Sequence, residues 1–513
     1  MKKNLTMLAF YSLTVAMVMD LHEYPLFATS GLALIFFLVV GGILWFLPAA
    51  LCSAEMATVK SWEAGGIYVW VKNTLGERWG FAAVFFQWFQ VTVGFIAMLY
   101  FVLGAISSAI GVPALNTDPT LKFAGVVVLF WLITAVQFGG SRVTEKMGDI
   151  GGIVGIMLPT TILLVLAVAY LVTGGHSQIP LSTQTLLPDF TKPGTLVVFV
   201  SFILSYMGVE SSASYVNDLE NPGRNYPLAM ILMVITAIAL NTIGGLSVAL
   251  TTPLSELSLS NGIVQALVVL FSHVGVHTKV AANVVALMIA LGVTAEVAGW
   301  VIGPARGMYM AAQQGLLPRA LCKVNRHDVP VVLVLVQGVI VTIWAAVLTL
   351  GGGGNNLSFL IAISLTVVIY VVAYLLLFVG YFVLIFKQKG LERKYQIAGG
   401  TTGKVLVAGA GIISTLFAFA ISFVPPSSLK GTEITTYTII LALGFIVTLA
   451  LPFVLYALRD KDPQKTIMPP VPVSADEART RRFVRPNRRG EHHIHPAPED
   501  YLKHSKMNLP HNS

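Results

Sequence analysis

Two apolar stretches of the chain each contain a carboxylate close to a residue that disturbs helices. Glu23 stands two residues before Pro25, and Glu210 stands two residues after Gly208. A charge at membrane depth costs about 2.5–3.5 kcal/mol on insertion scales, so it is normally retained for a function. Proline and glycine free backbone polar groups there, which is tolerated only where these groups line a cavity or pack against protein. Matched broken segments in two halves of a chain therefore predict the substrate site of a secondary transporter.

Membrane-spanning helices are expected to hold these residues. The chain has 513 residues, of which 56% are apolar and only 11% are charged, whereas soluble domains carry about 25% charged residues. Apolar runs of about 20 residues, the length that crosses a bilayer, occur twelve times. Their approximate bounds are 6–28, 32–57, 80–110, 122–139, 150–173, 194–216, 226–251, 280–311, 329–350, 357–386, 404–424 and 435–458. The sequence therefore predicts an all-α integral membrane protein with twelve transmembrane helices.

The distribution of basic residues predicts the orientation of the chain. An even number of spans puts both termini on one side, and with that side inside only four of the 32 Lys and Arg residues face outward. These four are Lys122, Lys192, Lys279 and Lys430. Because cytoplasmic loops carry an excess of Lys and Arg, both termini are predicted to be cytoplasmic. The net charge of +8 is therefore a topology signal, and no nucleic-acid partner is inferred from it.

The composition changes sharply at the end of the last span. Residues 1–458 form the predicted transporter domain, and residues 459–513 form a polar tail. The tail carries a basic and histidine-rich region with Arg488, Arg489, His492, His493, His495 and His504. It has too little apolar area to fold alone, so one interpretation is a disordered tail held near anionic membrane lipid. No Cys or carboxylate pair accompanies the histidines, so we predict no metal site.

The sequence predicts neither a cofactor nor an enzyme. Residues 399–405 are glycine-rich, but Ala398 and Val405 break the phosphate-loop pattern. Cys52 and Cys322 match no metal-ligand spacing and are too few for a disulfide framework. No span pairs His with carboxylates at a helical spacing that would build a catalytic metal site, which disfavours a membrane enzyme. A channel is disfavoured because the charges cluster midway instead of forming rings along a pore.

Several short motifs give the chain a family resemblance. It resembles the amino acid–polyamine–organocation superfamily of transporters over nearly its whole length and, more narrowly, the bacterial glutamate/γ-aminobutyrate antiporters. The motifs that carry the resemblance are residues 23–31 (EYPLFATSG), 54–58 (AEMAT), 205–210 (SYMGVE), 351–359 (GGGGNNLSF) and 365–370 (LTVVIY). Each motif alone is weak, but their order and spacing together are specific to the family and less specific to the substrate.

The resemblance implies a fold and a site. The fold would consist of two inverted five-helix repeats, as in LeuT-type transporters, plus two further helices, with spans one and six unwound near residues 21–23 and 208–211. Backbone N–H groups at a half-helix start would suit a substrate carboxylate, and free carbonyl groups would suit its ammonium. The implied substrate-binding residues are His22, Glu23, Gly208, Glu210, Glu296, Tyr370 and Tyr374. For the two tyrosines, ordinary helix packing is an equally good explanation.

The first span departs from the family pattern. Family members carry a tyrosine where this chain has His22, and a small neutral residue is expected where it has Asp20. A carboxylate and a titratable imidazole beside the site favour a more cationic substrate or product. Exchange of external glutamate for internal γ-aminobutyrate by alternating access is the leading hypothesis. The alternative is exchange of another amino acid for its decarboxylated amine, such as histidine for histamine or tyrosine for tyramine.

The resemblance also implies a cellular setting. The transporter would lie in the bacterial cytoplasmic (inner) membrane and would pair functionally with a cytoplasmic decarboxylase that turns the imported amino acid into the exported product, supporting acid resistance. In the family, the tail plugs the cytoplasmic opening at neutral pH. The tail residues named above, including His492 and Arg488, are therefore expected to act in pH gating, with the lipid-bound tail as the competing interpretation.

Overall fold

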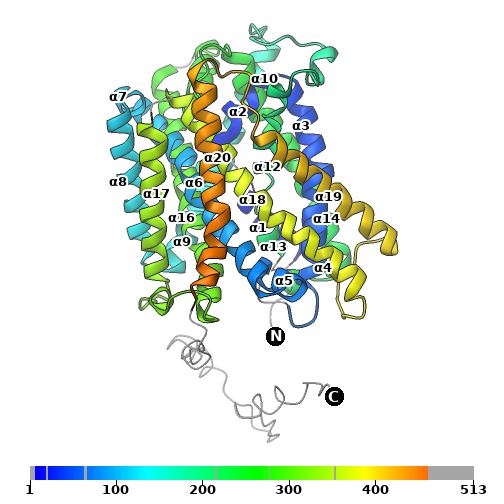
Figure 1. Cartoon of the computed structure of the whole chain (residues 1–513). Coiled ribbons are helices and arrows are strands. Elements are labelled where there is room, and N and C mark those ends of the chain that lie inside the picture. Colours follow the sequence, from blue (N-terminus) through cyan, green and yellow to red (C-terminus); the bar gives the residue numbers. More distant parts are fainter. Residues whose placement is uncertain are drawn as a thin grey trace, which may run out of the picture. The chain divides into compact units, whose positions relative to one another are not determined.

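Helices make up almost the whole structure (Figure 1). This computed structural model describes residues 6–18, 21–62, 66–213, 216–275, 278–351 and 354–459. Within these ranges, extended backbone pairing is limited to two isolated bridges, Val59 with Arg393 and Val324 with Pro330. The prediction of an all-α fold is confirmed.

Most of the described α-helices lie in the first half of the chain. That half contains α1 (Met7–Val18), α2 (Tyr24–Ala28), α3 (Ala33–Gly41), α4 (Leu47–Ala57), α5 (Gly66–Leu75), α6 (Glu77–Ile110), α7 (Ala114–Thr117), α8 (Pro119–Gln137), α9 (Ser141–Ile150), α10 (Leu158–Val172), α11 (Pro193–Leu196), α12 (Phe199–Leu204), α13 (Val209–Ala213) and α14 (Pro222–Thr251). The second half contains α15 (Gly262–His273), α16 (Thr278–Gln313), α17 (Val331–Leu350), α18 (Gly354–Lys387), α19 (Gly400–Ser422) and α20 (Thr432–Ala457). Two π-helical segments, η2 (Gly42–Phe46) and η3 (Gly151–Met157), join α3 to α4 and α9 to α10.

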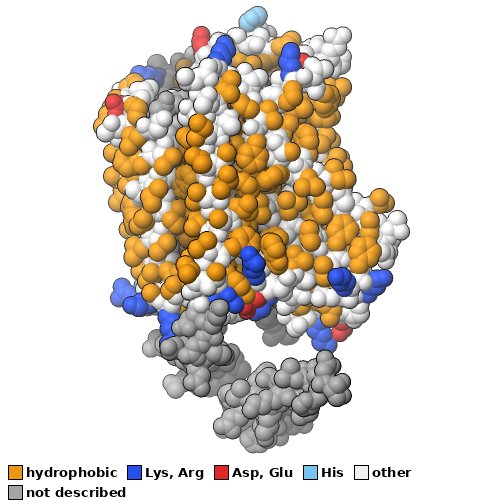
Figure 2. Space-filling view, in the orientation of Figure 1, with side chains coloured by type: hydrophobic (Ala, Val, Ile, Leu, Met, Phe, Trp, Pro, Cys, Tyr) orange, Lys and Arg blue, Asp and Glu red, His pale blue; other side chains and the backbone are white. Residues whose placement is uncertain are grey.

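Eleven segments of the described chain are long and apolar enough to cross a membrane. Each corresponds to one of the apolar runs that the sequence analysis identified, with ends that differ by a few residues. The remaining run, 6–28, is divided into shorter helices, so the count of twelve stays a prediction. Figure 2 shows apolar side chains over the middle of one face of the bundle and charged side chains at both ends. The chain is therefore a multi-pass membrane protein.

The first and sixth spans are both interrupted, five spans apart. In the first, the described part of α1 reaches Val18, and a short 3-10 helix (Leu21–Glu23) precedes α2. Pro25 lies in the first turn of α2, where its missing N–H costs no hydrogen bond. In the sixth span the break covers residues 205–208, between α12 and α13. The expected unwinding at 208–211 is therefore wrong by about three residues, because Gly208 takes the left-handed conformation (φ 94°) and the helix resumes directly after it.

Burial separates central helices from lipid-facing helices. The apolar window of α18 is 83% buried and that of α6 is 72% buried, whereas only 17% of the window of α20 is buried. The helices α6, α16 and α18 pack extensively, α6 against both of the others. These three helices therefore form the centre of the bundle beside the two interrupted spans, and α20 lies at the periphery.

A cluster of buried charges fixes one end of this core. The carboxylate of Glu55, at the end of α4, is fully buried and lies 3.1 Å from Arg393 Nη1 and 2.7 Å from Lys404 Nζ. It also accepts hydrogen bonds from the Tyr381 hydroxyl (2.8 Å) and the Ile397 N–H (2.9 Å). Burial of a charge is tolerated when it is paired and hydrogen-bonded in this way. The cluster ties α4, α18, α19 and the 388–399 loop together.

Candidate functional site

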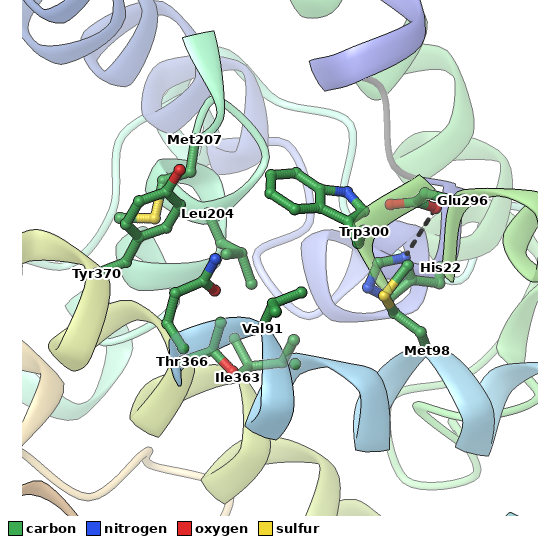
Figure 3. Close-up of a pocket in the computed structure, with 12 residues that line it drawn as sticks. His22, Val91, Met98, Leu204, Met207, Glu296, Trp300, Ile363, Thr366 and Tyr370 are labelled. Carbon is green, nitrogen blue, oxygen red and sulfur yellow. Dashed lines mark ion pairs between the residues drawn. The ribbon is translucent and has the colours of Figure 1, made fainter. Parts of the chain in front are cut away.

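The candidate site is a small cavity at the interrupted spans. Its volume is about 50 Å³, and its walls come from the first break, α6, the sixth span, α16 and α18. Figure 3 shows His22 and Glu296 on one side of the cavity and Met207 and Tyr370 on the other, with Trp300 between them. The helices that meet at this cavity are those that form the centre of the bundle.

His22 and Glu296 face each other across two segments far apart in the sequence. His22 lies in the 3-10 helix of the first break, and Glu296 lies midway along the apolar span of α16. The His22 Nδ1 atom is 4.0 Å from Glu296 Oε2 (Figure 3), and their side chains are 4% and 10% exposed. The two groups form an ion pair when the imidazole carries a proton, so the charge of this wall depends on the protonation of His22.

Glu210 lies at the start of α13 and is held by donors from two other helices. The hydroxyl groups of Tyr370 and Tyr374, on α18, both donate hydrogen bonds to its carboxylate. Gln87 Nε2, on α6, donates a third at 2.6 Å. Glu210 is only 1% exposed, and these hydrogen bonds satisfy the polar atoms of a buried carboxylate. Because Tyr370 lines the cavity, it connects Glu210 to the space where a ligand would bind.

The break in the sixth span is tied to the same network. The N–H of Gly208 donates a hydrogen bond to the Tyr374 hydroxyl at 3.1 Å. The family resemblance implies free N–H groups at this break for a substrate carboxylate, but the Gly208 N–H is already paired in the structure. Gly208 therefore joins the broken backbone to the tyrosines of α18, and Tyr374 acts as a hub between Gly208 and Glu210.

The predicted site residues occupy three positions. His22, Glu296 and Tyr370 line the cavity. Gly208, Glu210 and Tyr374 form the hydrogen-bonded network behind Tyr370. Glu23 is fully buried next to His22 but is not among the cavity-lining residues. Asp20 and all the predicted gating residues of the tail (His492, His493, His495, His504, Arg488 and Arg489) lie outside the described residues.

The cavity also contains residues that the sequence analysis did not identify. Trp300 is one helical turn beyond Glu296, and Thr366 is one turn before Tyr370. Residues four apart on a helix share a face, so this spacing was an available signal. Met207 comes from the break itself. The contribution of Gln87 to Glu210 had no local signal, because the two residues are 123 positions apart.

No metal-binding cluster occurs in the described part of the chain. No three His, Cys, Asp or Glu side chains come together there in a way that would hold a metal ion. The cavity instead offers one carboxylate (Glu296), hydroxyl groups, an imidazole and apolar walls. These groups can hold a small zwitterion by charge and hydrogen bonding, with the Glu296 carboxylate facing its ammonium.

Comparison with known proteins places this geometry in a family context. The sequence profile of the amino acid permease family matches residues 5–448. Over 503 residues the chain is 55% identical to a glutamate/gamma-aminobutyrate antiporter of Lactococcus lactis subsp. lactis (strain IL1403), covering 98% of this chain and 100% of the relative. A protein of the same name from Lactococcus lactis subsp. cremoris (strain MG1363) is similar to the same extent. An uncharacterized transporter of Legionella pneumophila is 29% identical over 90% of this chain and 98% of its own length.

Proposed function

This chain belongs to the amino acid permease family, and on that premise we propose that it exchanges external glutamate for internal γ-aminobutyrate by alternating access. The observation that carries the proposal is the 55% identity, over 98% of the chain, to relatives named as glutamate/gamma-aminobutyrate antiporters. The chemistry of the cavity supports it. Both substrates carry one ammonium group and at least one carboxylate, and the cavity walls combine the Glu296 carboxylate with the Tyr370 hydroxyl and His22.

The mechanism needs no covalent step and no cofactor. A substrate in the cavity would contact both interrupted spans, α6, α16 and α18, so its binding would be felt by each element that must move between outward-open and inward-open states. Interrupted helices suit this motion because their ends can rotate without breaking a continuous hydrogen-bond ladder. Exchange follows if the empty carrier reorients slowly and the loaded carrier reorients quickly.

His22 supports the second candidate function, exchange of another amino acid for its decarboxylated amine. The imidazole lies 4.0 Å from Glu296 on the cavity wall, at a position where the family resemblance implies tyrosine. If His22 is neutral, the wall keeps the full negative charge of Glu296, which suits a cationic amine such as histamine or tyramine. If His22 is protonated, the wall is closer to neutral and better suits glutamate. The two candidates therefore differ in the charge of one wall.

Counterflow in liposomes tests both candidates. Purified full-length protein is reconstituted, and uptake of labelled glutamate is measured with γ-aminobutyrate inside, beside labelled histidine against histamine and labelled tyrosine against tyramine. The proposal predicts glutamate uptake that depends on internal γ-aminobutyrate. Uptake into empty liposomes at the same rate would indicate a channel or uniporter, and faster histidine or tyrosine exchange would favour the second candidate.

The cellular role is part of the proposal. Decarboxylation of the imported amino acid consumes a proton, so export of the product removes acid equivalents from the cell. We propose that the transporter works with a cytoplasmic decarboxylase, lies in the bacterial inner membrane with both termini in the cytoplasm, and supports acid resistance. The basic excess on the predicted inner side supports this orientation. The tail of residues 459–513 is proposed to close the cytoplasmic opening near neutral pH.

A further inference from the structure

A second cavity of the bundle contains a buried lysine in its wall. Lys122, near the start of α8, is only 2% exposed. Six ion pairs occur among the described residues, and none of them includes Lys122. Taking an ammonium group out of water without a counter-ion is unfavourable, so buried lysines are normally paired. The positive charge of Lys122 therefore has no acidic partner in the described part of the chain.

Neutral groups hold the Lys122 ammonium in a defined place. Its Nζ atom donates to Asn355 Oδ1 at 2.8 Å and lies 3.9 Å from the centre of the Tyr100 ring. Asn355 is itself fixed, because its Nδ2 donates to the Asn116 carbonyl at 2.7 Å, and the Tyr100 hydroxyl is 2.7 Å from Thr349 Oγ1. An ammonium has three donors, so these contacts orient the group and leave donor capacity toward the adjacent space.

The adjacent space is a cavity of about 330 Å³. The size falls within the range of small-molecule sites. Tyr100, Thr349 and Ser358 are buried parts of the wall, whereas Thr117 and Pro119 are exposed and mark its mouth. Thr117 ends α7, which lies at the opposite end of the bundle from α5 (Figure 1). By the predicted topology this mouth opens to the outside.

We propose that this cavity binds the carboxylate of a small organic acid from the outer solution. A single buried ammonium beside hydroxyl and amide groups matches one negative charge. Phosphate sites in proteins draw on several cations or on rows of backbone N–H groups, and the described wall of this cavity has one cation. None of the described residues in the wall is a carboxylate, so the cavity would not select an ammonium group. The assignment does not depend on which substrate the central cavity takes.

The position of the cavity gives the binding a consequence. Its described lining residues differ from those of the central cavity, but both cavities take residues from α6 and α18. Tyr100 lies on the same helix as Gln90 of the central wall, and Ser358 on the same helix as Tyr370. A ligand that enters this cavity from the outer solution would therefore contact α6 and α18, two helices that also line the central cavity.

A cysteine at the mouth provides a direct test. Thr117→Cys is introduced with Cys52 and Cys322 replaced by alanine, and the full-length protein is reconstituted in liposomes of zwitterionic lipid. The rate of reaction with an external membrane-impermeant maleimide is measured with and without L-glutamate or glutarate. Each acid is expected to slow the reaction about tenfold when present at about ten times its dissociation constant. Glutarate is included because it lacks the ammonium group that the central cavity should require.

Charge variants identify the group responsible. Lys122→Gln and Lys122→Met are each expected to abolish the slowing, and Asn355→Asp, which supplies a carboxylate from within, should abolish it while keeping the lysine. Lys430→Gln, which changes an exposed lysine, is the matched control and should keep the slowing. Glu210→Gln should also keep it, which separates this site from the central one. Size-exclusion profiles establish that each variant is folded.

Three results would overturn the proposal. The first is an unchanged reaction rate for the Thr117→Cys protein at saturating glutamate and glutarate. The second is slowing that persists in both Lys122 variants. The third is slowing, without either acid, in parallel liposomes that contain anionic lipid, together with no effect of the acids in zwitterionic lipid, which would assign the cavity to a lipid phosphate. A failure of glutamate exchange in the counterflow assay would leave the expected protection unchanged, so the two proposals are tested separately.

Discussion

Glu210 is a buried carboxylate that does not line the candidate site directly. Its oxygen atoms accept hydrogen bonds from Tyr370, Tyr374 and Gln87. Of these donors and Glu210 itself, only Tyr370 lines the cavity. Glu296 is different, because its carboxylate lines the cavity and lies 4.0 Å from His22. We therefore expect Glu296 to contact the substrate and Glu210 to position the Tyr370 hydroxyl.

The first prediction concerns Glu296→Ala, which should reduce exchange strongly while leaving the protein folded. Loss of a hydrogen bond between the substrate ammonium and this carboxylate costs about 1.5–3 kcal/mol, or roughly 10- to 100-fold in apparent affinity. Exchange in liposomes measures the effect, and Glu296→Gln controls for side-chain size by removing only the charge. A monodisperse Glu296→Ala protein that exchanges at the full rate would show that this carboxylate is not used.

The second prediction concerns His22→Tyr, which introduces the side chain that the family resemblance implies and removes a titratable group from the cavity wall. Selectivity should shift toward glutamate over amine-bearing competitors by about 1–2 kcal/mol, roughly 5- to 30-fold. Competition between labelled glutamate and the amines measures the ratio. His327→Tyr changes an exposed histidine and serves as the control. An unchanged ratio in His22→Tyr would mean that His22 does not select the substrate.

At the scale of elements, the position of Glu296 depends on how closely α16 approaches η3. A Cβ atom on Gly292, one turn before Glu296, would lie 2.7 Å from backbone atoms of Gly155. A Cβ atom on Gly155 would lie 2.3 Å from the Gly292 backbone. Both positions therefore require glycine, because a side chain on either helix would push the two backbones apart and would move Glu296 relative to His22.

The third prediction follows from this contact. Gly292→Ala should destabilise the protein by about 1–3 kcal/mol, the usual cost of overpacking a tight contact, and should slow exchange. Gly299→Ala is the matched control on the same helix, since a Cβ there meets no atom within 4 Å, and alanine favours a helix over glycine by about 1 kcal/mol. Thermal unfolding in detergent and liposome exchange measure the two effects. Equal melting temperatures for the two variants would contradict the prediction.

The fourth prediction concerns the cluster that ties the 388–399 loop to α4. Glu55→Ala leaves Arg393 and Lys404 buried without their carboxylate, and breaking a buried ion pair costs about 3–5 kcal/mol. A marked fall in the thermal unfolding temperature is expected. Glu392→Ala, in the same loop, breaks a pair with Lys60 whose side chains are both 78% exposed, and such surface pairs contribute about 0–1 kcal/mol. Similar unfolding temperatures for the two variants would show that the Glu55 cluster does not stabilise the fold.

At the scale of the whole molecule, hydrophobicity predicted the spans well because each must cover the same bilayer thickness. The predicted run 435–458 corresponds to α20 (Thr432–Ala457), for example. The charged and helix-breaking residues predicted the approximate positions of the two breaks, because a charge and an unpaired backbone group are each costly in lipid. The π-helical segments and the Glu55 cluster could not be predicted. A π-turn leaves no mark in the apolar pattern, and Glu55 meets Arg393 across 338 positions of sequence.

The tail is the part of the molecule whose proposed role depends most on net charge. From Arg459 onward it holds eleven Lys and Arg, seven Asp and Glu, and five His. An unperturbed histidine has a pKa of about 6.5. If the docked tail holds neutral histidines, docking lowers their pKa values. Docking then becomes weaker as the pH falls, because the free histidines gain protons that the docked ones do not. Paired carboxylates also have lowered pKa values when docked, so their contribution is lost in the same direction. Docking should therefore be strong near pH 7 and weak below about pH 6.

The last prediction is that deleting residues 473–513 raises exchange at pH 7 and changes it little at pH 5. Each unit by which docking lowers a histidine pKa weakens docking by about 1.4 kcal/mol once the pH falls below both the free and the docked pKa, so a few histidines shifted together suffice to release the tail on acidification. Liposome exchange across the pH range measures both proteins. Replacing His492, His493, His495 and His504 by glutamine keeps the tail but removes four of its five titrating imidazoles, and this variant should stay closed to a lower pH than the wild type. If the truncated protein keeps the full-length pH profile, the gate lies in the transporter domain, and the tail is better explained by binding to anionic lipid.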